Sequence, residues 1–197
     1  LADRVFDLAW THSQVVLRQL NATEADAQLY GHLAGSVIFA HSSMRADYGI
    51  IARNRYGQSG LWGYSISGDL PIVLLQIEDP ANINLARQLI QAHNYWRLKG
   101  LAVDLVIWNE DHAGYRQGLH EQIMGLIAAG AEANVTDWPG GIFVRPAEQM
   151  SNEDRILLQT VARAIITDSR GSLADQINRR SHANVPAPRL RPTRTGS

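Results

Sequence analysis

The sequence contains no cysteine, and Lys99 is the only lysine among its 18 basic residues. Without cysteine there is no disulfide, no thiolate metal ligand and no cysteine nucleophile. No apolar run approaches the roughly 20 residues that a membrane-spanning helix needs. The chain begins at Leu1 without a stretch typical of a signal peptide. These absences predict a soluble piece of a longer protein, without direct membrane insertion, and they fit a reducing compartment.

Motifs for phosphate, metal and nucleophile chemistry are also missing. There is no G-x-G-x-x-G and no Walker pattern. The seven histidines do not fall at metal-ligand spacing. Gly63-Tyr64-Ser65-Ile66-Ser67 approaches the G-x-S-x-G nucleophile elbow, but its second glycine is one place late and it precedes a strand instead of following one. We therefore predict no catalytic residue, no metal and no cofactor, and we expect these serines to bond local backbone.

The formal net charge of −1 hides an uneven distribution of charge. Residues 179–197 carry five arginines, three prolines and no acidic residue, so the rest of the chain has a net charge of −6. This tail has little to bury, which predicts a disordered basic linker. It lacks the aromatic side chains that stack on bases, so we expect no nucleic-acid partner.

Regular structure is clearest in residues 70–178. Apolar runs at 70–77, 101–108 and 141–145 alternate with helical patterns, and such continuous runs are typical of a parallel sheet covered on both faces. The pattern predicts an α/β module with a small, three-stranded, mostly parallel sheet and flanking helices. Ser151 and Asp154 predict a last long helix through Ile165, which continues to about Arg179 either unbroken or with a break near Gly171.

The first 69 residues divide into two predicted segments. Residues 1–45 read as two amino-terminal helices, the second capped by Thr23 with Asp26. Residues 46–69 mix five glycines with aromatic side chains, which predicts an irregular connector with short extended pieces.

Two places carry the candidate site residues, as contacts for a ligand or for another domain. One is the end of the connector, with its aromatic, hydroxyl and acidic side chains. The other follows the second predicted strand, at the sheet edge where ligands of parallel sheets usually bind, although a strand-to-helix loop needs polar capping groups in any case. The candidates are Trp62, Tyr64, Ser65, Ser67, Asp69, Asn109, Glu110 and Asp111. Asp104, inside the second apolar run, is expected on an edge strand or paired with an arginine.

Four long strings in the chain resemble one family. They are DRVFDLAWTHSQVVLRQLN (3–21), GQSGLWGYSISGDLPIVLLQIED (57–79), AHNYWRLKGLAVDLVIWNED (92–111) and PGGIFVRPAEQMSNEDRILLQTVAR (139–163). They resemble the carboxyl-terminal region of bacterial cyclic β-1,2-glucan synthases, which is similar to family 94 glycoside phosphorylases. The resemblance covers about residues 1–180.

This resemblance implies a place within a larger protein. Such a stretch lies between β-sandwich modules, ahead of an (α/α)6 barrel whose D-W-N-D-G motif carries the general acid. That motif is absent here, so no catalytic residue is carried over. The implied parent is a glycosyltransferase of the inner membrane, with this piece on the cytoplasmic side.

Three functional hypotheses follow from the resemblance. The first is a non-catalytic inter-domain module whose partners are adjacent domains of the same parent chain. The second is a carbohydrate-binding module with β-1,2-glucan as partner, because exposed aromatics such as Trp62, Tyr64, Tyr56 and Trp138 can stack on sugars. The third is an independent glycan-active enzyme.

Overall fold

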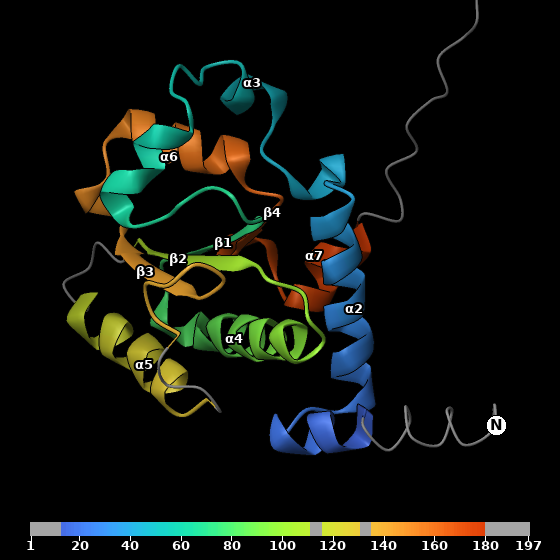
Figure 1. Cartoon of the computed structure of the whole chain (residues 1–197). Coiled ribbons are helices and arrows are strands. Elements are labelled where there is room, and N and C mark those ends of the chain that lie inside the picture. The colour runs from blue at the N-terminus through green and yellow to red at the C-terminus, as the bar shows by residue number, and fades with distance from the viewer. Residues whose placement is uncertain (1–12, 111–115, 131–134, 180–197) are drawn as a thin grey trace, which may run out of the picture.

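A computed structural model describes residues 13–110, 116–130 and 135–179 of the chain. Its centre is a sheet with the strand order β3-β2-β1-β4, in which every pair of neighbours is parallel (Figure 1). The strands are β1 (Ile72–Ile77), β2 (Asp104–Asn109), β3 (Ile142–Pro146) and β4 (Ala164–Thr167). The α/β class is confirmed, but the sheet has four strands instead of the predicted three.

Helices cover both faces of this sheet. α4 and α5 lie on one face, with α2 and α7 beside α4, whereas α6 and α3 lie on the other (Figure 1). This division follows from the strand order, because α4 and α5 lead outward from β1 to β3 and α6 leads back to β4. The bounds are α2 (Glu24–Ile38), α3 (Tyr48–Ile51), α4 (Ile83–Leu98), α5 (Arg116–Ala128), α6 (Asn152–Val161) and α7 (Leu173–Asn178).

The strands are apolar on both sides, and alternate residues enter two separate cores. Val73 and Leu75 of β1 join the core under α4 and α5, while Leu74 joins the core under α6. Trp96 of α4 and Trp108 of β2 are fully buried, one in each core. Burial on both faces explains why the strands read as continuous apolar runs.

Local signals in the sequence set several helix ends, and the start of α2 is as predicted. Thr23 caps α2, with its side chain accepting from the Asp26 amide and the Asp26 carboxylate accepting from the Thr23 amide. α4 follows Asn82 and ends before Gly100, whose φ of +83° favours glycine. Residues 13–19 are also helical, so the described part of the first predicted helix agrees.

The predicted last long helix is wrong. α6 ends at Val161, and residues 164–167 form β4, which pairs with β1 along Val73–Gln76. The helical spacing of the apolar residues continues into Ile165, but Ile165, Ile166 and Thr167 are β-branched and fit a buried strand better. A separate helix, α7, follows β4.

The predicted extended pieces of the connector are also wrong. Residues 46–69 contain the short helix α3 and the 3-10 helix η2 (Gln58–Tyr64), and no strand. Leu61 and Ile66 are fully buried in the core under α6. The connector therefore packs against the sheet, on the face that α6 covers.

Candidate functional site

The structure separates the predicted site residues into two groups. Ser67 and Asp69 precede β1, whereas Asn109 and Glu110 stand at the end of β2. The two strands are parallel and in register. The two groups therefore lie at opposite ends of the strands, about 16 Å apart along a six-residue strand. Asp111 lies outside the described residues.

The η2 helix is held closely against α6. A Cβ atom on Gly60 would lie 2.7 Å from Leu157 Cδ2, so a larger residue here would require the Leu157 side chain to shift. The Tyr64 hydroxyl donates to Asp154 Oδ2 of α6 at 2.8 Å. Burial and this hydrogen bond raise the pKa of Tyr64 above its ordinary value. Tyr64 therefore anchors the aromatic segment to the helix behind it.

The loop that follows η2 is tied together by its own polar groups. Gln58 Nε2 donates to Ser67 O at 2.7 Å and to Asp69 Oδ1 at 2.8 Å. Ser67 Oγ accepts from the Asp69 amide at 3.2 Å, which is the local bonding expected of these serines. Ser65 ends η2 with a φ of 63°, and its side chain makes no hydrogen bond to another described residue. No nucleophile–base pair forms here.

Arg145 of β3 joins two exposed aromatic segments. Its Nη2 donates to Tyr64 O and to Asp137 Oδ1, each at 2.7 Å. Its guanidinium lies 5.6 Å from the centre of the Phe143 ring, and its side chain is only 18% exposed. The partly buried guanidinium thus ties the segment of Trp62 to the segment of Trp138.

We call Trp62, Tyr64, Asp137, Trp138 and Arg145 the Arg145 surface. Trp62 is 64% exposed and Trp138 is 69% exposed. The Trp62 indole N–H donates to Ser67 O at 3.3 Å, so the ring is exposed and yet held in place. Such fixed indole faces can stack on a sugar ring or on apolar side chains, and the Asp137–Arg145 pair can hydrogen-bond beside them.

No motif or spacing in the sequence marked Arg145 and Asp137 as part of this site. Arg145 lies 81 residues from Tyr64 along the chain. A single arginine at a strand end is common, so only the three-dimensional fold reveals this contact. Trp138, in contrast, was expected among the exposed aromatic side chains, and it is exposed.

The polar groups at the carboxyl ends of the strands belong to the strand ends and to the loops that follow them. Asn109 is buried, and the Glu110 amide donates to Ile77 O at 2.8 Å. Between β1 and β4, Asp168 Oδ2 accepts from the amides of Glu78 and Asp79 at 3.0 and 2.9 Å. The Asp168 carboxylate, just after β4, thus binds the loop that follows β1 and helps to order it.

A buried polar cluster lies at the amino-terminal end of β2. Asp104 is fully buried in the interior strand β2, and its Oδ1 accepts from the Gly140 amide at 2.6 Å. His93 Nε2 lies 3.0 Å from both Val103 O and Gly140 O, so it donates to these carbonyls. The expectation of an edge strand or an arginine partner for Asp104 is wrong, because a backbone amide binds it. Burial raises the pKa of Asp104.

Two searches of the described residues gave negative results. Within residues 13–110, 116–130 and 135–179, no three His, Cys, Asp or Glu side chains gather where they could hold a metal ion. In the same part of the chain, no helix combines the length and apolar character of a membrane span.

Comparison with known proteins gave one clear relative. No protein-family model matches the sequence. The chain is 31% identical over 172 residues to the cyclic beta-(1,2)-glucan synthase NdvB of Rhizobium meliloti (strain 1021). The match covers 87% of this chain but only 6% of the length of that protein. The resemblance predicted from the sequence is confirmed: this chain is related to a segment of a cyclic β-(1,2)-glucan synthase.

Proposed function

We propose that the chain is a non-catalytic module of a cyclic β-1,2-glucan synthase, and that it positions neighbouring domains of the same parent chain. The observation that carries this proposal is the Arg145 surface. The exposed indoles of Trp62 and Trp138, on segments tied together by Arg145, match the aromatic and arginine anchors of protein interfaces. The small share of the relative's length that this chain matches supports a role among other domains.

The rigidity of the Arg145 surface argues for a docking role. Trp62 stands on the short helix η2 and Trp138 on the loop before β3. Hydrogen bonds from Trp62 to Ser67 and from Arg145 to Tyr64 and Asp137 tie these segments down. A preformed surface loses little conformational freedom when a partner binds, which favours binding. A neighbouring domain that covers both indoles would bury apolar area that is now exposed to water.

A test of docking uses a full-length synthase that contains this segment. Changing both Trp62 and Trp138 to alanine should leave the isolated chain folded, since both side chains are exposed. In the full-length protein, the double variant should be cut severalfold faster by a protease at the borders of the module. Tyr48→Ala is the matched control, because Tyr48 is 84% exposed and lies on α3, outside the Arg145 surface. Equal cleavage of all three proteins would contradict docking through this surface.

The same indoles support a second candidate, a binding site for β-1,2-glucan. Sugars present apolar faces that stack on exposed indoles, and the Asp137–Arg145 pair offers an acceptor and donors for hydroxyl groups. Titration of the isolated chain with linear and cyclic β-1,2-glucans separates the two candidates. Saturable binding at millimolar glucan that is lost in Trp62→Ala supports glucan binding, and no binding leaves docking as the better account.

A further inference from the structure

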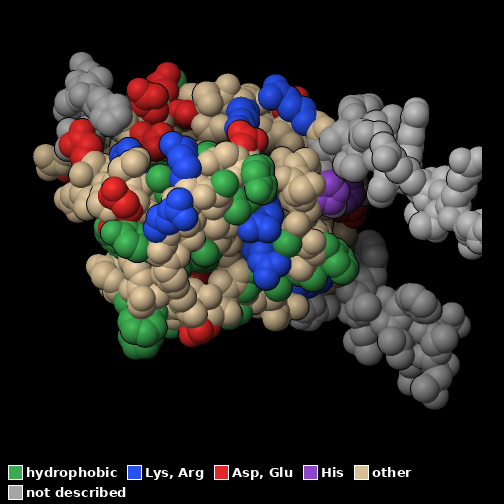
Figure 2. Space-filling view, turned by 90° about the horizontal axis from the view of Figure 1, so that it is seen from above, with side chains coloured by type: hydrophobic (Ala, Val, Ile, Leu, Met, Phe, Trp, Pro, Cys, Tyr) green, Lys and Arg blue, Asp and Glu red, His purple; other side chains and the backbone are tan. Residues whose placement is uncertain are grey.

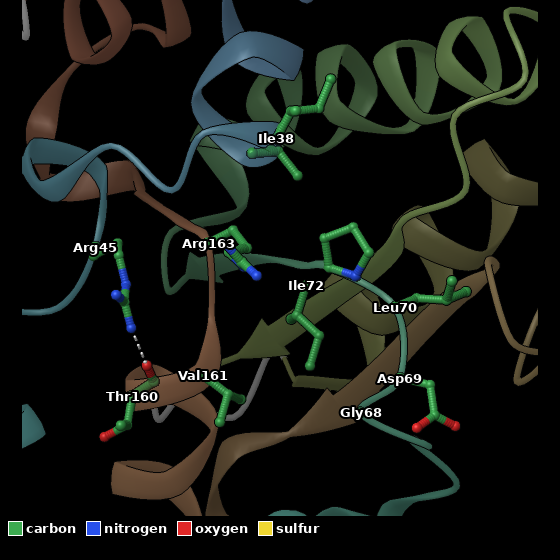
Figure 3. Close-up of a pocket in the computed structure, with 11 residues that line it drawn as sticks. Ile38, Arg45, Gly68, Asp69, Leu70, Ile72, Thr160, Val161 and Arg163 are labelled. Atoms are coloured by element: carbon green, nitrogen blue, oxygen red, sulfur yellow. Dashed lines mark hydrogen bonds between the residues drawn. The ribbon is translucent and has the colours of Figure 1, made fainter.

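A cleft of about 720 Å³ opens beside the amino-terminal ends of β1 and β4 (Figure 3). Its walls come from the end of α2, the loop before β1 and the end of α6. Apolar side chains line it, among them Ile38, Pro71, Ile72 and Val161. Its volume lies within the range of about 300–1,000 Å³ typical of small-molecule sites. None of these residues belongs to the Arg145 surface.

Arg45 supplies the first positive charge of this cleft. Its Nη2 donates to Thr160 O at 2.9 Å, and the side chain is half-buried. Within the described residues this is its one hydrogen bond, and its Nε is buried without a partner. Because a guanidinium has five N–H donors, Arg45 is held in place with donors to spare.

Arg163 supplies the second positive charge, from the residue just before β4. Its backbone amide donates to Ile72 O at 2.8 Å, which fixes its position at the cleft, while its side chain is exposed. Figure 3 shows Arg45 and Arg163 on one side of the cleft and Asp69 on the other. The Asp69 carboxylate accepts from Gln58, and no described carboxylate pairs with either arginine.

Further arginines lie on this side of the sheet, since Arg53 and Arg55 follow α3 and Arg155 belongs to α6. Figure 2 shows arginine side chains along the middle of the face that carries α3 and α6, with acidic side chains around them. Guanidinium groups attract anions over distances of about 10 Å at moderate ionic strength. Two guanidinium groups without a carboxylate partner favour an oxyanion, which arginine binds through paired hydrogen bonds.

We propose that this cleft binds a small organic anion. Its phosphate or carboxylate group lies beside Arg45 and Arg163, and its apolar part lies on Pro71 and Ile72. This site is separate from the Arg145 surface and does not rest on the docking role. Both kinds of ligand, phosphate or carboxylate, consist of an oxyanion joined to a short apolar group.

The test is a titration of the isotope-labelled chain followed by NMR. The probes are butyl phosphate, pentanoate, inorganic phosphate and butanol, each up to about 10 mM, which detects dissociation constants in the millimolar range. We expect saturable shifts at amides of residues 68–72 and 160–163 with butyl phosphate or pentanoate. The tighter of the two identifies the anionic group. Butanol should give no saturable shift, and inorganic phosphate should bind more weakly than butyl phosphate.

Variants assign the binding to the arginines. Arg163→Gln should weaken binding about tenfold, as expected for loss of a charge-assisted pair of hydrogen bonds. It keeps the backbone bond to Ile72, so the fold should persist. Arg55→Gln is the matched control, since Arg55 is exposed and does not line the cleft. Absence of saturable shifts, or equal weakening by both variants, would overturn the proposal.

Discussion

Asp104 is the residue whose ionisation most directly affects the fold. It is fully buried, its Oδ1 accepts from Gly140, and its Oδ2 has no hydrogen-bond partner among the described residues. Burial, followed by the charge of Asp69, raises its pKa in the folded state. The folded protein therefore holds this proton more tightly than the unfolded chain does. Stability from this group is present at low pH and is lost as pH rises through the folded-state pKa.

The matching prediction is that Asp104→Asn removes this pH dependence. The variant keeps an oxygen to accept from the Gly140 amide but carries no charge. Urea unfolding between about pH 4 and pH 8 should show wild-type stability falling relative to the variant as pH rises. Asp47→Asn, at an exposed position at the start of α3, is the control and should change the difference little. Parallel curves for wild type and Asp104→Asn would contradict the account.

Arg145 gives the second prediction at the residue scale. Arg145→Ala removes the hydrogen bonds to Tyr64 O and Asp137 and the contact with the Phe143 ring. We expect a loss of about 1–2 kcal/mol in the free energy of unfolding, because hydrogen bonds from a charged group are worth that much when partly buried. Arg53→Ala, at an exposed position on the same face, should cost less than about 0.5 kcal/mol. Similar losses in chemical denaturation would show that Arg145 does not hold the two segments together.

At the residue scale, composition predicted only part of the site. Trp62 and Tyr64 stood out as aromatic side chains in a glycine-rich segment, although Tyr64 is half-buried and packs against the core under α6. Arg145, Arg45 and Arg163 gave no such signal, since arginine is the common basic residue of this chain. Their roles depend on contacts between segments far apart in sequence, such as Arg45 with Thr160, which are 115 residues apart.

At the scale of elements, the turn before β3 depends on one glycine. A Cβ atom on Gly141 would lie 2.0 Å from Val135 O and 2.7 Å from Trp138 O, both backbone atoms that cannot move aside singly. Gly141→Ala should therefore cost at least about 2 kcal/mol of stability. Gly118→Ala in α5 meets no atom within 4 Å and should be neutral or stabilising by up to about 1 kcal/mol. Thermal unfolding of both variants checks this, and equal midpoints would refute it.

The elements that the sequence predicted well are those with strong local patterns. β1 and β2 are apolar on both faces, and α4 lies between a polar start and Gly100. β4 was missed because it is only four residues long and follows α6 after two residues, so its apolar residues prolong the helical spacing. Pairing with β1 decides its conformation, and that pairing is a long-range contact.

At the scale of the whole molecule, the account rests on what covers the Arg145 surface. The chain matches a small part of a much longer relative, and the exposed indole of Trp62 is held by a hydrogen bond to Ser67 O. Inside a parent synthase, docking predicts that a neighbouring domain covers Trp62 and Trp138. The buried indoles of Trp96 and Trp108 should remain protected in every form and serve as internal references.

Hydroxyl-radical footprinting, read out by mass spectrometry, measures this coverage directly. The isolated chain and a full-length synthase containing it would be oxidised under identical conditions. The account predicts rapid oxidation of Trp62 and Trp138 in the isolated chain and severalfold protection of both in the full-length protein, with Tyr48 changed little. Equal oxidation of Trp62 and Trp138 in the two proteins would contradict it.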